Sequence, residues 1–221
     1  YVKMKEKDPE FAIMTEGIND AMLVDVDIFQ GVPGNINSPG CFPEMFRYTF
    51  PEAIGIALNS DPSLRRYDLN HEAIFGLRHE IMSRYQGDVD YLNYGKLPSE
   101  ESYAHINDTP DIKQLNEVPA EEVTSYTHSM FQFENDNADY FRSGKFIDED
   151  GIKITGDEIL GKGFLNGSKM GVVVWNKNLS EKRDFSVSVP GYHLVKATEP
   201  EKPEVNASSP LNANSIRLLI F

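Results

Sequence analysis

The sequence predicts a mixed chain, with an α/β part over residues 1–146 and an all-β part, a small antiparallel β-sandwich, over residues 147–221. In the first part, a short apolar run is followed by stretches of helical periodicity, which is typical of strand–helix units. After Gly144 the chain changes to short runs rich in β-branched and aromatic residues, separated by turn residues. Regular strands with regular turns are typical of a sandwich.

The most informative segment is the apolar run over residues 11–17, which ends in Glu16 and Gly17. This pattern predicts a buried strand that carries a carboxylate to a binding face. Residues 20–30 fit both a helical stripe and a strand-like alternation, and we favour a helix. The Pro- and Gly-rich residues 31–42 predict a loop.

Further along, residues 46–50 predict a second short strand, which ends at Pro51 because proline lacks the backbone donor for a strand ladder. A helix capped by Asn70 is expected to continue to Gly87. Another helix is expected between Pro119, which suits a first turn, and Gly144.

The strands of the sandwich are expected where β-branched and aromatic residues cluster. Asn166-Gly167, between two such runs, indicates a hairpin. The expected strands are 158–164, 170–175, 185–189, 192–197 and 215–221.

Composition excludes several classes of function. A net charge of −14 disfavours nucleic acid and anionic membrane surfaces, which need a basic face. No apolar span is long enough for membrane insertion. The single Cys41 excludes an intrachain disulfide and a multi-cysteine zinc site. Asp20, Asp25 and Asp27 lack the spacing of a calcium loop, and the sequence has no Walker A or dinucleotide-binding glycine motif. No metal and no cofactor is therefore expected.

These features together resemble the C-terminal part of a glycoside-hydrolase-like (β/α)8 barrel with a trailing β-sandwich, a type of secreted carbohydrate-active protein found in gut bacteria. The residues that carry the resemblance are Thr15-Glu16-Gly17, Asn19-Asp20, Phe46-Arg47-Tyr48, Pro51-Glu52, Phe75-Gly76-Leu77-Arg78, Tyr140-Phe141, the segment from Gly144 to Asp148, and Val172-Val173-Val174-Trp175-Asn176.

The resemblance implies that residues 1–146 supply the last strand–helix units of a partial barrel. It implies an oligo- or polysaccharide substrate and a secreted or periplasmic location. The strand with the nucleophile is expected earlier in a parent enzyme, so this chain alone is expected to be inactive. An incomplete parallel sheet exposes edges and apolar faces, so we also expect a homo-oligomer.

By the resemblance, Glu16 is the candidate general acid/base, and Asn19 or Asp20 binds a sugar hydroxyl. Capping of the following helix, or a pair with a lysine, is the structural alternative for Glu16. Arg47 is a candidate for binding an acidic sugar or holding Glu16, with a salt bridge at the sheet rim as its alternative. The alternative function is a non-catalytic carbohydrate-binding or structural module, with the tyrosines of residues 85–103 as a stacking platform.

Overall fold

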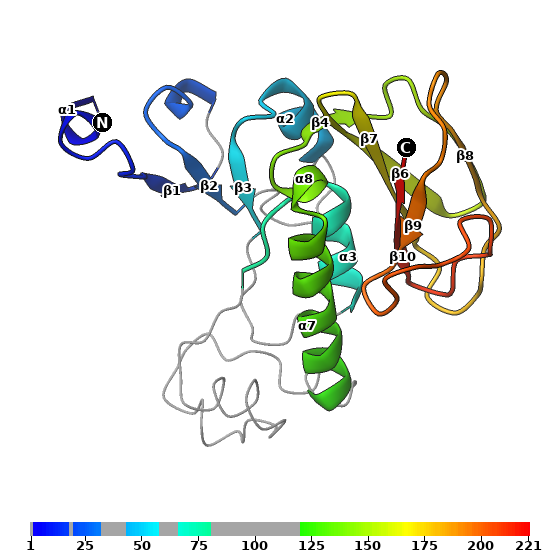
Figure 1. Cartoon of the computed structure of the whole chain (residues 1–221). Coiled ribbons are helices and arrows are strands. Elements are labelled where there is room, and N and C mark those ends of the chain that lie inside the picture. The colour runs from blue at the N-terminus through cyan, green and yellow to red at the C-terminus, as the bar shows by residue number, and fades with distance from the viewer. Residues whose placement is uncertain (1, 18–19, 32–42, 58–65, 81–119) are drawn as a thin grey trace, which may run out of the picture.

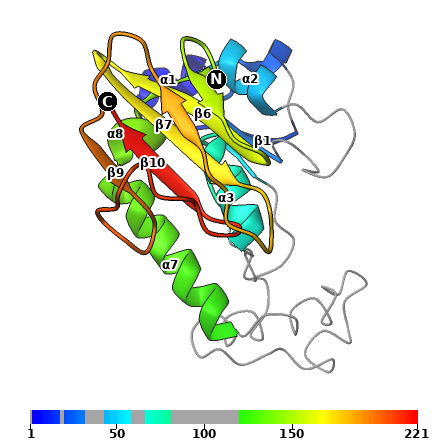
Figure 2. The same cartoon turned by 90° about the vertical axis from the view of Figure 1, so that its right-hand side faces the viewer.

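The computed structural model describes residues 2–17, 20–31, 43–57, 66–80 and 120–221. Helices and parallel strands come first, and antiparallel sheet structure follows (Figure 1, Figure 2). Among these residues, no helix combines the length and apolar character that a membrane crossing requires. The helices are α1 (Val2–Lys7), η1 (Asp20–Met22), α2 (Pro43–Thr49), α3 (Arg66–Ile74), α7 (Ala120–Asp136) and α8 (Ala138–Phe141).

Three short strands form a parallel sheet in the order β1-β2-β3. They are β1 (Met14–Glu16), β2 (Ile28–Gln30) and β3 (Ile54–Ile56), and the helices η1, α2 and α3 follow them in turn. Arg78 adds a parallel bridge to Ile56 beyond β3. The mixture of helices and strands is confirmed, but the helix favoured over residues 20–30 is wrong, because this segment holds only the short η1 and then the strand β2. The parallel pairing that the structure describes closes no barrel.

The two faces of the parallel sheet differ in their cover. Phe29 in β2 is completely buried, and its ring packs edge-on against Phe46 of α2 with 5.6 Å between ring centroids. Successive residues point to opposite faces, so the other face carries Met14 and Ile54, which are 54% and 40% exposed. The prediction of a buried first strand is thus wrong, because β1 pairs with a described strand on one side only.

The predicted strand over residues 46–50 is also wrong, because residues 46–49 belong to the helix α2 and Phe50 follows its end. Pro43 begins α2 at a position where a backbone N–H is not needed, and Glu44 in the first turn suits the helix dipole. Phe46 and Phe50 are one helical turn apart, and their ring centroids are 5.7 Å apart. Five residues are too few to distinguish a strand from a helix by periodicity.

The helix α3 begins before Asn70 and ends earlier than predicted, so Asn70 is an interior residue and not a cap. Gly76, with a φ of +64°, stops the helix in the left-handed conformation. The Leu77 N–H donates to the Glu72 carbonyl at 3.0 Å, which closes the end of the helix. The chain then turns into the parallel bridge at Arg78. Gly87, the predicted end, lies outside the described residues.

The helix predicted between residues 119 and 144 is confirmed as two consecutive helices, α7 and α8, which meet at Asn137. Tyr126, Met130 and Phe133 of α7 are buried, and their spacing of four and three residues places them on one helical face. This face packs into the core that α3 shares.

The C-terminal part contains a five-stranded antiparallel sheet in the order β4-β6-β7-β10-β9 and a two-stranded sheet, β5-β8. All five predicted runs contain strands, and the β6–β7 hairpin turns at Gly167 as predicted. The strands β4 and β5 were not foreseen. The bounds are β4 (Lys145–Asp148), β5 (Lys153–Thr155), β6 (Ile159–Asn166), β7 (Lys169–Asn176), β8 (Ser186–Ser188), β9 (Lys196–Thr198) and β10 (Ile216–Ile220).

The five-stranded sheet separates two apolar clusters. Val173 and Trp175 of β7 face the cluster shared with the helices, whereas Val172 and Val174 face the cluster shared with β5 and β8. This alternation is that of a strand buried on both faces. The first cluster runs from the parallel sheet into the antiparallel one without a break, and the boundary at residues 146/147 stays a prediction.

Replacing Gly76 by alanine should lower the free energy of unfolding. A Cβ at Gly76 would lie 2.7 Å from Cε1 of Phe164, whose side chain is completely buried. We expect a loss of about 2 kcal/mol or more in urea unfolding, from left-handed strain plus overpacking. Gly167 is the matched control, because it has a φ of +60° with no atom within 4 Å of an added Cβ. Equal losses for Gly76→Ala and Gly167→Ala contradict the packing argument.

Self-association of the chain stays a prediction. Parallel sheets are normally covered on both faces, whereas Ile54 is 40% exposed. We expect light scattering at about 100 μM, above the dissociation constants of most specific interfaces, to give a mass above the 25.0 kDa monomer. Ile54→Lys should shift the mass toward the monomer. A monomeric unmodified chain at this concentration refutes the expectation.

Candidate functional site

Polar side chains gather at the edge of the parallel sheet where the strands end. Glu16 ends β1 and Gln30 ends β2, and the two residues are direct partners in the register. Their side chains therefore leave the sheet on the same face. Gly17 and Gly31 follow with φ values of 85° and 83°, so the chain turns away directly after each polar residue. The edge thus presents a carboxylate beside an amide.

Glu80 brings a second carboxylate to this edge. It lies two residues after Arg78, which forms the parallel bridge to Ile56 at the end of β3. The side-chain amide of Gln30 donates a hydrogen bond to Oε1 of Glu80. We call Glu16, Gln30 and Glu80 the edge cluster.

The structure describes only part of the predicted site. The side chain of Glu16 is exposed at the end of β1. Asp20 begins η1, and Asn19 lies outside the described residues. The catalytic role of Glu16 and the sugar-binding roles of Asn19 and Asp20 stay predictions.

Arg47 lies on α2 and not on a strand, and only 6% of it is exposed. Its guanidinium donates to the carbonyls of Phe75 at 3.2 Å, Ala53 at 2.6 Å and Pro51 at 3.5 Å. Burial, together with the charge of Arg78, lowers the pKa of Arg47 to about 10. These contacts fasten α2 to the segments before β3 and after α3. Its predicted contact with a ligand stays a prediction.

A buried ionic network lies directly beside the edge cluster. The imidazole of His79 is 2% exposed, and its Nδ1 lies 2.5 Å from Oε2 of Glu72 while its Nε2 lies 3.0 Å from Oε1 of Glu134. Burial alone lowers the pKa of His79, but the charges and hydrogen bonds of Glu134 and Glu72 outweigh burial and raise that pKa to about 10. His79 is therefore a protonated link between α3, the bridge at Arg78 and α7.

The sequence did not predict this network or the position of Glu80. The helix expected from Asn70 to Gly87 placed His71 and His79 on one helix. Only His71 is helical, and it packs against the rings of Phe75 and Trp175 with centroid distances of 5.0 and 6.0 Å. Burial lowers the pKa of His71 to about 4. Gly76 is the signal that could have placed the two histidines in different elements, because a glycine often ends a helix and it precedes His79 and Glu80.

The part of the chain that the structure describes holds no group of three or more histidine, cysteine or acidic side chains arranged for a metal ion. The side chains of the edge cluster are themselves two carboxyl groups and an amide. Such groups can transfer protons and accept hydroxyl hydrogen bonds.

The His79 network predicts a specific dependence of stability on pH. The pKa of His79 is raised in the folded state to about 10 from about 6.5 in the unfolded state. The stabilisation is therefore complete below about pH 6.5 and is lost as the pH rises toward 10. Urea unfolding between pH 7 and 9 should show a slope of up to about 1.4 kcal/mol per pH unit, and His79→Gln should remove it. His128, exposed on α7, is the matched control, and an equal change of slope in His128→Gln argues against this origin.

No protein-family model matches the chain, and no curated protein matches it. Among solved structures, it is similar to AmyB, a noncanonic maltogenic alpha-amylase from Thermotoga neapolitana, with 13% sequence identity and a TM-score of 0.45. The match covers 100% of this chain and 55% of that chain, so this chain spans about half the length of that protein. A likeness of this size shows neither a family nor an activity, and a function has to be argued from the residues of the chain.

Proposed function

We propose that the chain is a region of a glycoside hydrolase acting on an oligo- or polysaccharide outside the cytoplasm, with Glu16 as its general acid/base. The observation that carries this proposal is the edge cluster. It combines the ends of two neighbouring parallel strands, Glu16 and Gln30, with the carboxylate of Glu80. In barrels of parallel strands, this edge is where active sites are built.

Glycoside cleavage needs two carboxyl groups beside the scissile bond. Glu80 is our proposal for the second one, because the Gln30 amide that holds its Oε1 belongs to the strand next to Glu16. In this arrangement Glu16 protonates the leaving oxygen, and the Glu80 carboxylate stabilises or attacks the sugar carbon. The side-chain oxygens of Asn19 and Asp20 then accept hydrogen bonds from hydroxyl groups of the bound sugar.

The second candidate is a non-catalytic carbohydrate-binding module. The exposure of the Glu16 side chain favours it, because an exposed carboxylate works well as a hydroxyl acceptor and less well as a proton donor. A measurement of hydrolysis distinguishes the two candidates, because only the first predicts that the protein cleaves its ligand.

The test uses the natural protein that carries this chain. Glu16→Gln should reduce kcat on an unactivated oligosaccharide by about 10² to 10⁴, the usual effect of losing a general acid. On an aryl glycoside with a good leaving group, the same variant should retain most of the first bond-cleaving step, because that group needs no proton. Glu80→Gln should lose activity on both substrates.

Glu10→Gln serves as the control, because Glu10 is exposed and lies close to Glu16 in the sequence. Unchanged turnover in Glu16→Gln excludes its catalytic role. Equal losses on both substrates exclude the role of general acid.

A further inference from the structure

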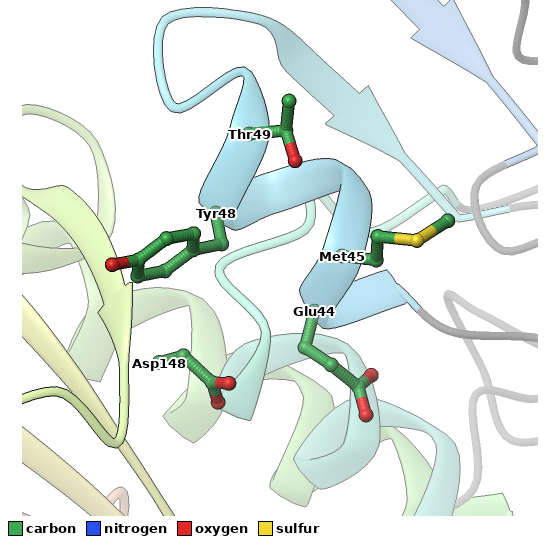
Figure 3. A pocket seen from close by; sticks show the side chains of 5 residues that line it. All are labelled: Glu44, Met45, Tyr48, Thr49 and Asp148. Carbon is green, nitrogen blue, oxygen red and sulfur yellow. The ribbon is translucent and has the colours of Figure 1, made fainter.

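A pocket lies between α2 and β4, outside the edge cluster (Figure 3). Its volume is about 400 Å³, and it is lined by Glu44, Met45, Tyr48 and Thr49 of α2 and by Asp148 of β4. We call it the α2–β4 pocket. The helix α2 covers the Phe29 face of the parallel sheet, whereas Glu16 and Gln30 point to the opposite face by strand alternation. The pocket is thus separate from the proposed catalytic edge.

Two large apolar side chains in this pocket are exposed. Tyr48 is 49% exposed and Met45 is 68% exposed, although both lie on a helix whose other side is buried. In Figure 3 the ring of Tyr48 extends from α2 toward β4, above the carboxylate of Asp148. An exposed ring beside an acceptor can hold a sugar, because one face of a pyranose is apolar and its rim is hydroxylated.

Asp148 is brought into the pocket by an irregularity of its strand. The β4–β6 register shifts between Phe146 and Asp148, and Asp148 has a φ of 54°, which is rare for a residue other than glycine. Bulges of this kind redirect a side chain. Oδ1 of Asp148 accepts from Nζ of Lys162 at 2.5 Å, and no described residue donates a hydrogen bond to Oδ2. One carboxylate oxygen is therefore available to a ligand.

The hydrogen bonds around Asp148 leave room for a hydroxyl donor. Nζ of Lys162, whose side chain is 6% exposed, lies 2.5 Å from Oδ1 of Asp148 and 3.0 Å from Oε1 of Glu149, and a cation would have to compete with this internal partner of both carboxylates. A hydroxyl group can donate to Oδ2 and leave the ion pair intact. Charge-assisted hydrogen bonds of this type are stronger than neutral ones.

We propose that the α2–β4 pocket binds a sugar unit of an oligosaccharide, with the apolar face of the pyranose on Tyr48 and its hydroxyl groups donating to Asp148 and Glu44. A volume of about 400 Å³ lies within the range of small-ligand sites. The proposal shares with the proposed function only the class of ligand, because the pocket needs no turnover and no contribution from Glu16.

Calorimetric titration of the full chain with maltotetraose, cellotetraose and xylotetraose tests the proposal, with choline as the cationic probe. At least one tetrasaccharide should bind with a dissociation constant of about 1 mM, typical of one stacked ring with few hydrogen bonds. Tyr48→Ala should weaken it by about five- to tenfold, the worth of one stacking contact. Tyr48→Phe should bind as the unmodified chain does, because the ring is kept.

Leu179→Ala is the surface control, since Leu179 is 68% exposed and is not among the residues that line the pocket. Three results overturn the proposal: no binding of any tetrasaccharide up to about 20 mM, unchanged affinity in Tyr48→Ala, or tighter binding of choline than of every sugar. Glu16→Gln should keep the binding, and Tyr48→Ala should keep hydrolysis of the aryl glycoside. Failure of either proposal is therefore visible without the other.

Discussion

The buried contact of His79 with Glu72 and Glu134 is the constraint on which the mixed part of the fold depends. Charges in an apolar interior are unfavourable unless each is paired and hydrogen-bonded. Here three groups come from α3, from the segment after Arg78 and from α7, and all three must be present to satisfy one another. Glu80 is the next residue along the chain, so the place of the edge cluster follows from this ionic link.

A second polar link joins the α/β part to the antiparallel sheet. The hydroxyl of Tyr126 donates to Oδ1 of Asn70 at 2.5 Å, and Nδ2 of Asn70 donates to the carbonyl of Asn214 at 2.9 Å. The indole of Trp175 donates to the side chain of Asn214 at 3.2 Å. Asn214 has a φ of 45°, a conformation that asparagine tolerates better than most residues. A buried asparagine inside a helix is thus explained by a partner far along the sequence.

The sequence predicted most where local chemistry is unambiguous. Turn residues such as Asn166-Gly167 separate the sandwich strands, and the hairpin forms there because glycine accepts the left-handed conformation. The helix α7 followed from its long apolar periodicity. Short segments were harder: the residues around Arg47 were predicted as a strand, whereas they form a helix that packs Phe46 on Phe29.

The site was predictable only in part for the same reason. Glu16 stands out because it ends an apolar run, whereas Glu80 depends on a pairing between segments far apart in the sequence. Extending the third helix beyond Gly76 placed Glu80 on a helical surface, where a carboxylate carries no signal. The buried partners of His79 come from two different helices, and no local pattern marks such a contact.

The close approach of Phe164 to Gly76 also limits how this architecture can be recombined. The ring occupies the space where the Cβ of any side chain at position 76 would lie, so the end of α3 and the strand β6 pack closely only with a glycine there. A sandwich grafted from another protein would have to present a flat ring at the same spot. Chimeras of the two parts should therefore be designed around this pair of positions as one unit.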